Sequence, residues 1–518
     1  MSREGLVIDN FSGGLNNTAD PALIAENELS EVKNLVLSRT GKLISRPPFT
    51  KKTNFPGTET SIKMLGYFRN EDAVVYAIVA GAAKTYLFDI VGGTWTEIWG
   101  YAAEDSTTYL NRLYLVSSTN GGGYWSKISG TYTWTAVAAM PNGNQIHFTK
   151  GRLYISSRAL SNTSTIRYSN ITSISAGTSI HEFPTTNFID VNEGDGQLLV
   201  KIIEGNNELF LFRTNSTWRL SFGASAEPTD GTLTTVSWTV GADNTNCVVE
   251  GENYLAVLHA GTAYQLAGYN YYPMNEYNKV QFKTKGTNHT IPTALSKVGQ
   301  YLIVWFHGSM YCYDTESKVW TEFESDTKAA HFIEAPRGTL LDSDAAVTAY
   351  GVAGEPVTGG GLLKFSEEFT DTASELIVCS IKTKTYDINQ PSQFKRLFGW
   401  ELLVIAVNWV EAGINPIDTI DAPIMYWTEL DDYSWQQAEF QEIPWAPINS
   451  AVPVIVGGLP QTNPVPQVVK VSGKQTFKRA YFSVVFRNDG SKATSPSRLD
   501  GIVLYLTNGR RIAMGRTA

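Results

Sequence analysis

The side chains that could perform chemistry are few in this chain, and they are scattered along it. No histidine lies near a second histidine or a cysteine at the spacing of metal ligands. The three cysteines lie far apart, and their odd number predicts free, buried thiols in a reducing compartment. We expect structural roles for all nine residues: His147, His181, His259, His289, His307, His331, Cys247, Cys312 and Cys379.

The best candidate for a metal site is the acidic segment 190–196, Asp-Val-Asn-Glu-Gly-Asp-Gly. It resembles a calcium loop, but its third ligand comes one position late and no closing glutamate follows at the required distance. We interpret it as a turn. The glycine triplets at 121–123 and 359–361 precede neither a helix nor a Lys-Ser/Thr pair, so they are predicted to be loops. No cofactor, metal or catalytic residue is predicted, although a carboxylate pair of a hydrolase cannot be recognised by spacing among 50 acidic residues.

The composition favours strands as the elements that position these residues. Hydrophobic residues make up 42% of the 518 residues, charged residues 18% and aromatic residues 12%, and there are 44 glycines. Such a mixture is typical of many short strands joined by tight turns. No apolar h-region follows Met1, and the longest apolar runs are too short for a transmembrane helix. We expect folding in the cytosol and no stable membrane insertion.

Internal repeats predict a β-propeller. The frame Tyr86-Leu87-Phe88-Asp89, with Trp95-Thr96-Glu97 after it, recurs as Tyr311-Cys312-Tyr313-Asp314 with Trp320-Thr321-Glu322. We expect Trp95 and Trp320 to occupy equivalent positions, each packed between adjacent sheets. A turn followed by an apolar strand also recurs along the chain from position 72. Each interval between two such starts is long enough for about four strands, as in a propeller blade. Six such starts predict about six blades, with five or seven still open; they stand at positions 72, 111, 151, 207, 253 and 299.

Three domains are predicted around this propeller. Residues 1–60 are expected to form an N-terminal arm that contacts an adaptor or a ring neighbour. Apolar residues at helical spacing predict one short helix within residues 21–37 of that arm. The propeller is assigned to residues 61–350, because the blade rhythm stops near the glycines at 359–361. Residues 351–518 are predicted to form a β-sandwich-like platform domain with one long, proline-rich connection.

Charge is strongly segregated along the chain. No Lys or Arg lies between Arg396 and Lys470, where nine acidic residues stand, whereas ten basic residues and only two acidic ones follow from Lys470 onward. A closed ring needs two complementary faces per subunit, so we predict that these blocks meet between subunits. Two competing interpretations are solvated faces that happen to segregate and pairing inside one sandwich. The predicted intersubunit residues are Asp431, Asp432, Glu439, Glu442, Arg510, Arg511 and Arg516. A third, basic group is predicted to contact a partner protein: Arg39, Lys42, Arg46, Lys51 and Lys52.

Two segments resemble the tail nozzle family of short-tailed bacteriophages, also called tail tubular protein B. The first is Asn10-Phe11-Ser12-Gly13-Gly14-Leu15, followed by Glu28 and by residues 34–48, which begin with Asn34 and end in Arg46-Pro47-Pro48. The second is Asp195-Gly196-Gln197, followed by residues 207–220, and it is similar to a mid-propeller signature of phage tail and neck proteins. The resemblance covers roughly the first 50 residues and one blade well, and the rest by architecture only.

The resemblance implies a structural virion protein. Family members form a six-fold ring below the adaptor of the head-to-tail connector, and the genome leaves through the channel of that ring. Tail fibres or spikes are further possible partners. We expect assembly in the host cytoplasm, and a channel wall that is acidic or neutral, because basic contacts to phosphates would hold a moving duplex. The alternative is a receptor- or glycan-binding propeller at a tail tip, and a polysaccharide hydrolase is a weaker one.

Overall fold

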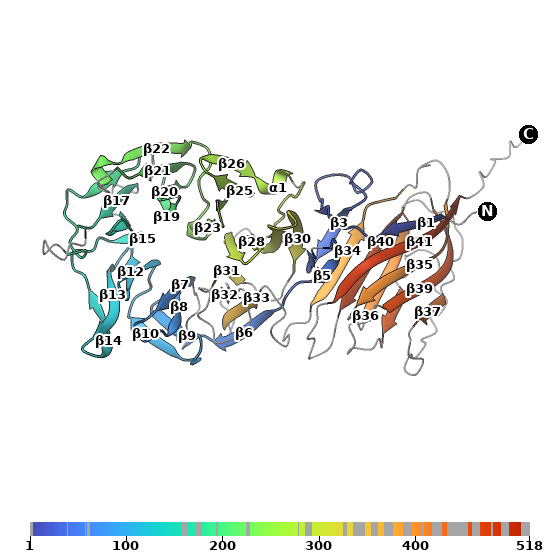
Figure 1. Cartoon of the computed structure of the whole chain (residues 1–518), viewed down its shortest axis with the longest axis horizontal. Helices are drawn as coiled ribbons and strands as arrows, with labels where there is room; N and C mark the ends of the chain where they lie inside the picture. Colours follow the sequence, from blue (N-terminus) through green and yellow to red (C-terminus); the bar gives the residue numbers. More distant parts are fainter. Residues whose placement is uncertain are drawn as a thin grey trace, which may run out of the picture.

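The computed structural model shows an all-β protein with two lobes, a propeller and a sandwich (Figure 1). It describes residues 4–38, 40–56, 59, 63–157, 164–171, 179–192, 195–223, 228–277, 279–284, 293–324, 329–334, 348–353, 361–366, 377–386, 395–405, 409–416, 427–431, 454–457, 467–477, 480–487 and 497–508. Within these ranges the only α-helix is the single turn α1 (Met274–Tyr277). The predicted fold class is therefore correct.

Six consecutive antiparallel blades of four strands each make up most of the propeller. Blade one contains β7 (Lys63–Arg69), β8 (Val75–Ala80), β9 (Thr85–Asp89) and β10 (Trp95–Trp99). Blade two contains β11 (Asp105–Tyr109), β12 (Arg112–Ser117), β13 (Gly121–Ile128) and β14 (Thr131–Ala136). Blade three contains β15 (Gly143–Thr149), β16 (Arg152–Ser157), β17 (Thr165–Tyr168) and β18 (Phe188–Asp190).

The next three blades follow the same order from the inside outward. Blade four contains β19 (Leu199–Gly205), β20 (Glu208–Arg213), β21 (Thr217–Ser221) and β22 (Thr232–Ser237), with the 3-10 turn η1 (Pro228–Asp230). Blade five contains β23 (Val248–Glu250), β24 (Leu255–His259), β25 (Thr262–Ala267) and β26 (Asn270–Pro273), preceded by η2 (Thr245–Cys247). Blade six contains β27 (Ala294–Val298), β28 (Tyr301–Phe306), β29 (Ser309–Asp314) and β30 (Val319–Phe323).

Strand β6 completes a seventh blade and closes the ring. Its residues, Phe49–Asn54, precede blade one in sequence but pair with β33 (Gly361–Ser366), outside β31 (Ala329–Glu334) and β32 (Thr348–Ala353). The first strands of neighbouring blades contact each other, and β7 contacts both β11 and β31. The blade number is therefore seven. The six predicted starts mark blades one to six, and the blades extend beyond the predicted limits of 61 and 350.

The second lobe is a sandwich built from both ends of the chain. One sheet has the order β37 (Trp427–Asp431), β39 (Gln467–Phe477), β35 (Lys395–Ile405), β41 (Arg498–Asn508), β5 (Leu43–Ser45) and β4 (Leu35–Leu37), with β1 (Glu4–Ile8) also on β41. The other contains β2 (Gly14–Leu15), β3 (Glu28–Lys33), β34 (Val378–Thr383), β40 (Ala480–Arg487), β36 (Trp409–Pro416) and β38 (Val454–Gly457). The N-terminal segment is thus part of the sandwich, and the propeller is inserted between its strands.

The helix predicted within residues 21–37 is not present. The segment forms turns and then β3 and β4. The apolar residues Leu29 and Val32 are both buried although they are three positions apart, because β3 has a register shift between Leu29 and Glu31 where it pairs with β34. A β-bulge of this kind changes which side chains share a face, so a strand can imitate helical spacing.

The two lobes share one sheet and one core. β3 of the sandwich pairs with β30 of blade six, so hydrogen-bonded strands run from the propeller into the sandwich. Buried apolar residues also form one continuous cluster across the boundary, from Val484 and Ile502 of the sandwich to Trp320 of blade six and Val257 of blade five. The lobes are therefore packed as one unit.

Candidate functional site

Arg46 lies at the boundary of the two lobes and is fully buried. Its Nε donates a hydrogen bond to Oδ1 of Asn34 at 2.9 Å, and its guanidinium nitrogens donate to the carbonyl oxygens of Pro47 (2.9 Å) and Glu324 (3.0 Å). The guanidinium also lies over the ring of Phe49, 4.6 Å from its centroid. A buried charge is tolerated only when it is hydrogen-bonded in this way. Arg46 therefore joins parts of its own chain, and the predicted partner contact is wrong for this residue.

Asn34 is the second member of this joint. Its side chain accepts a hydrogen bond from the backbone nitrogen of Glu324 (2.7 Å) and donates to the carbonyl of Val378 (2.8 Å). Its backbone nitrogen donates to the carbonyl of Glu322 at 2.8 Å. Asn34 has a φ of 56°, which asparagine tolerates better than most residues. One side chain thus connects the end of β3 to blade six and to β34.

Gly14 belongs to the glycine pair of the first segment that resembles the nozzle family, and its surroundings require a glycine. It has a φ of +62°, and a Cβ atom there would lie 1.7 Å from Cγ1 of Val319 on β30. Only glycine can occupy a position where a neighbouring strand approaches so closely. Three residues of the first segment, Gly14, Asn34 and Arg46, therefore pack the sandwich against the propeller.

The other members of the predicted basic group lie in different places. Lys42 is half-buried and donates to the carbonyl oxygens of Asp9 (2.9 Å) and Asp500 (2.8 Å), so it ties the N-terminal strands to β41. Lys51 and Lys52 are exposed on β6, the outer strand of blade seven. Arg39 is outside the described residues. Of the predicted basic contact surface, the structure thus leaves Lys51 and Lys52 at the surface.

The acidic and basic blocks interleave within one sandwich as far as they are described. β37, from the acidic block, pairs with β39 of the basic block, with Glu429 opposite Lys470. β36, also from the acidic block, pairs with β40. For these strands the arrangement favours pairing of the acidic and basic blocks inside one sandwich. Asp431 is the last residue of β37, whereas the other predicted charge-face residues lie outside the described ranges: Asp432, Glu439, Glu442, Arg510, Arg511 and Arg516. The intersubunit contact stays a prediction.

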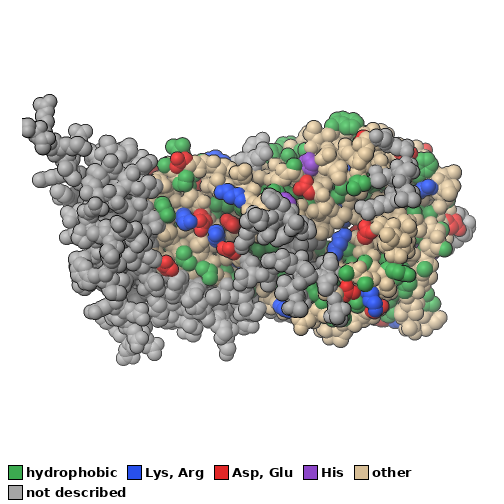
Figure 2. Space-filling model, turned by 180° about the vertical axis from the view of Figure 1, so that it is seen from behind, with side chains coloured by type: hydrophobic (Ala, Val, Ile, Leu, Met, Phe, Trp, Pro, Cys, Tyr) green, Lys and Arg blue, Asp and Glu red, His purple; other side chains and the backbone are tan. Residues whose placement is uncertain are grey.

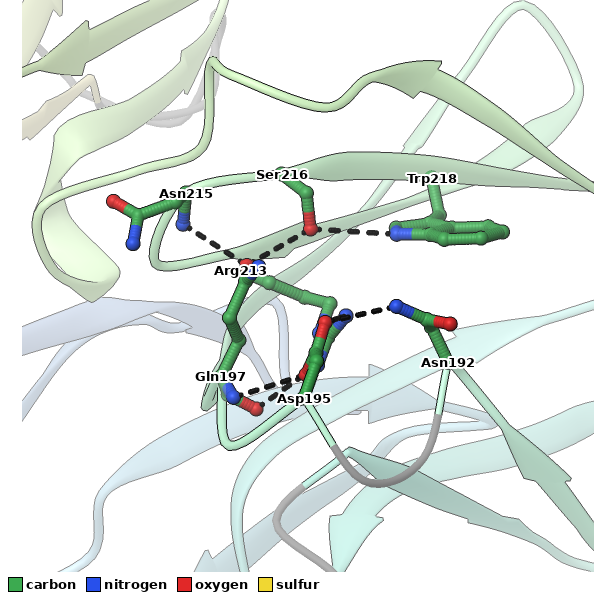
Figure 3. A network of polar contacts seen from close by, with 7 residues as sticks. All are labelled: Asn192, Asp195, Gln197, Arg213, Asn215, Ser216 and Trp218. Atoms are coloured by element: carbon green, nitrogen blue, oxygen red, sulfur yellow. Dashed lines mark hydrogen bonds and ion pairs between the residues drawn. The ribbon is translucent and has the colours of Figure 1, made fainter.

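The second motif forms a polar network at one end of blade four (Figure 3). Arg213, at the end of β20, is fully buried and makes a two-pronged ion pair with Asp195, with one N–O distance of 2.7 Å. Gln197 accepts hydrogen bonds from the backbone of Asn215 (3.2 Å) and the hydroxyl of Ser216 (2.9 Å). The network therefore holds the loop before β19 against the β20–β21 turn.

The same network includes Asp195, the last acidic residue of the calcium-loop candidate. Asp195 accepts hydrogen bonds from Arg213, from the backbone of Gln197 (3.0 Å) and from the side chain of Asn192 (2.9 Å). The Arg213 guanidinium is the main reason why the pKa of Asp195 lies below its usual value. A carboxylate held by an arginine is a poor cation ligand, because the site already contains its counter-ion. The turn interpretation therefore fits residues 191–192 and 195–196, whereas Asp190 ends β18.

A cavity of about 440 Å³ lies on the axis of the propeller. Its walls come mainly from the first strands of six blades, and its charged lining residues are Lys63, Lys201, Lys297, Asp105, Glu250 and Glu334. Figure 2 shows basic and acidic side chains close together near the middle of the propeller on the face opposite to Figure 1. No sequence pattern indicates this group, because its members come from different blades and meet only when the ring closes.

Ionic contacts cross this cavity from blade to blade. Nζ of Lys201 in blade four lies 3.9 Å from Asp105 in blade two, and Nζ of Lys297 in blade six lies 4.0 Å from Glu334 in blade seven. Lys63 donates to the carbonyl oxygen of Glu104 at 2.5 Å. Burial is the main cause that lowers the pKa of Lys63. These side chains leave room for a small molecule and no passage for a double helix along the propeller axis.

The cysteines have the predicted character. Cys247, Cys312 and Cys379 are free and buried, and burial raises the pKa of Cys247 and of Cys379 to about 12. Thiols of this kind are mostly protonated and unreactive. Among the described residues, no group of three His, Cys, Asp or Glu side chains could hold a metal ion, and no helix is long and apolar enough to cross a membrane.

Comparison with known proteins supplies fold relations only. No protein-family model and no curated protein matches this chain. The extracellular domain of the system BT4673 from B. thetaiotaomicron matches with a TM-score of 0.43 at 10% identity, over 64% of this chain and 41% of that domain. Virginiamycin B lyase from Staphylococcus aureus matches with a TM-score of 0.41 at 11% identity, over 61% of this chain and 98% of the lyase. The designed Ika8 protein matches with a TM-score of 0.35. Similarity at this level carries no argument about function.

Proposed function

We propose that this chain is a non-enzymatic structural protein of a short bacteriophage tail, part of a six-fold nozzle or hub ring below the adaptor. The observation that carries the proposal is the joint of Gly14, Asn34 and Arg46. Three residues of the segment that resembles the nozzle family lie where the propeller packs against the sandwich, and β3 continues the sheet of blade six. A component that must keep its shape during genome ejection requires such a rigid connection between its lobes.

In this role the genome passes beside the propeller and not through it. The axial cavity is crossed by side chains of opposite charge, so the propeller's own axis is not the conduit. The channel would be enclosed by six subunits, and its wall is expected to be acidic or neutral. Lys51 and Lys52, exposed on β6, are the described part of the surface proposed to contact the adaptor.

Particles of the phage that encodes the chain provide the test. Antibody labelling with gold should mark the tail below the head, and quantitative mass spectrometry should find about six copies per particle, or a small multiple, as expected for a closed ring. Negative-stain images of the purified assembly should show a ring with a central channel. Absence of the chain from purified particles, or robust polysaccharide hydrolysis by the pure protein, would overturn the proposal.

One observation favours the receptor- or glycan-binding alternative. Trp238 is 62% exposed and meets Trp218 edge to face, with 5.1 Å between ring centroids, beside the polar network of blade four. Exposed aromatic groups of this size often mark binding surfaces. If the alternative is correct, gold labels gather at the distal tip, and Trp238→Ala reduces attachment of particles to the host. Unchanged attachment leaves the nozzle role as the better account.

A further inference from the structure

We propose that the axial cavity of the propeller binds a small multivalent anion, a molecule that carries carboxylate or phosphate groups. The cavity measures about 440 Å³, within the range of roughly 300–1,000 Å³ typical of small-molecule sites. This inference concerns the propeller alone and does not rest on the proposed role in a phage tail.

The lysines of the cavity carry hydrogen-bond donors that the described residues do not satisfy. The nearest carboxylate oxygens to Lys201 and Lys297 are 3.9 Å and 4.0 Å away, beyond the length of a hydrogen bond. Both side chains are about four-fifths buried, with exposed fractions of 22% and 18%. An ammonium group has three donors, and partial burial limits the water that can satisfy them. The cavity therefore has free capacity to donate.

Two of the three carboxylates that line the cavity are already engaged by the main chain, and the third, Glu250, is exposed. Asp105 accepts from the backbone nitrogen of Ile146 at 3.0 Å, and Glu334 accepts from the backbone nitrogen of Gly299 at 3.1 Å. Backbone donors offset part of the negative charge of Asp105 and Glu334, whereas the carboxylate oxygens that face Nζ of Lys201 and Lys297 lie beyond hydrogen-bond distance. These two lysines therefore lack hydrogen-bond acceptors among the described residues, and a bound anion supplies them.

Two lysines share one carboxylate at the site where the anion would sit. Lys63 and Lys201 come from blades one and four, and the charge of Asp105 acts on both. Lys201 and burial together lower the pKa of Lys63, so a bound anion would stabilise its ammonium form. Lys297 approaches from blade six. A ligand with separated anionic groups would use Lys297 in addition to the Lys63–Lys201 pair, and we expect a single phosphate to bind at that pair, where both lysines face Asp105.

Isothermal titration calorimetry on the full chain, at constant ionic strength, tests the proposal with two probes, citrate and inorganic phosphate. We expect saturable binding of citrate with one site per chain. Lys201→Met should weaken that binding roughly tenfold or more, since a charge-assisted hydrogen bond is lost. Lys297→Met should weaken citrate binding and leave phosphate binding, where it is measurable, unchanged. Lys84→Met, which removes an exposed lysine of blade one, is the matched control and should leave both unchanged.

The outcomes distinguish binding at the cavity from binding that depends on the net charge of the chain. Thermal melting of each variant confirms that it is folded, and both test lysines are partly exposed, so their replacement by methionine is compatible with folding. Absence of saturable heat with both probes at millimolar concentrations would overturn the proposal. The same loss of affinity in Lys84→Met and Lys201→Met would also overturn it, because binding would then depend on net charge alone.

Discussion

Blade one and blade six contain the same hairpin in two different surroundings. In blade one Trp95 on β10 lies opposite Phe88 on β9, and in blade six Trp320 on β30 lies opposite Tyr313 on β29. Both tryptophans are on the outermost strand of their blade and in the same register, as the repeated sequence frame predicted. In both hairpins the aspartate that ends the third strand, Asp89 or Asp314, accepts hydrogen bonds from the turn that follows.

The tryptophans also contact the preceding blade in the same way. The indole nitrogen of Trp95 donates to the carbonyl oxygen of Asn54, at the end of the outer strand of blade seven (3.0 Å). That of Trp320 donates to the carbonyl of Met274, just after the outer strand of blade five (3.4 Å). Each ring therefore packs between adjacent blades, as predicted.

The two positions differ in burial. Trp320 is 1% exposed, because β2 and β3 of the sandwich lie against β30. The ring of Phe282 also packs against the Trp320 ring, with 5.2 Å between the ring centroids. Trp95 is only half-buried, because no strand among the described residues pairs with the outer side of β10. The hairpin determines the orientation of the indole ring, and the neighbouring lobe determines how much of the ring is buried. The sequence alone predicted equivalent positions for both residues, and the structure shows that their burial differs.

The largest effect is expected at blade six. Trp320→Ala should lower the free energy of unfolding by about 3–5 kcal/mol, because it leaves a large cavity in the core shared by the two lobes. Urea unfolding followed by circular dichroism measures the change, and Trp320→Phe, which keeps much of the ring, should cost less. A loss below about 1 kcal/mol for Trp320→Ala would contradict the shared core.

A smaller effect is expected at the equivalent position of blade one. Trp95→Ala should cost about 1–2 kcal/mol, because a half-buried ring gives up less apolar contact and a smaller cavity remains. The same urea experiment serves, with Trp95→Phe as the matched variant. If the two alanine variants lost equal stability, the contact with the sandwich would add nothing to blade six.

The smallest effect is a pH dependence at the turn of blade six. Burial raises the pKa of Asp314, so the folded chain holds this proton more tightly than the unfolded chain does. Its favourable contribution is complete below the unfolded pKa, about 4, and is lost as the pH rises through the folded pKa. Asp314→Asn keeps an acceptor oxygen for the turn and cannot ionise. Its unfolding free energy, relative to the wild type, should therefore rise from pH 4 toward neutral pH. A constant difference would contradict this assignment.

The repeated turns could be read from the sequence because their chemistry is local. Residues with positive φ occupy the two-residue loops Leu110-Asn111, Lys150-Gly151 and Asn206-Asn207, each between the first and second strands of a blade. Glycine and asparagine favour this conformation, and primed turns suit the twist of a hairpin. The predicted starts therefore fell just before the second strands of blades one to six.

The β3 segment and the basic group show where local reading failed. A bulge gave Leu29 and Val32 the spacing of a helix, and a pairing with β34, some 350 residues away in sequence, made the segment a strand. Arg46 looked like an exposed member of a basic run, because nothing local signals that its guanidinium would be enclosed by carbonyl groups from both lobes. In both cases the deciding partner is distant in the chain.

The sequence by itself determined the all-β class, the hairpins with their turns, the equivalence of Trp95 and Trp320, and the free state of the cysteines. These features depend on residue type and on neighbours a few positions away. Only the tertiary structure decided the seventh blade, the union of both chain ends in one sandwich, and the meeting of Lys63, Lys201 and Lys297 on the axis. Each of these requires long-range pairings, such as β6 with β33, which form when the ring closes and which no local pattern encodes.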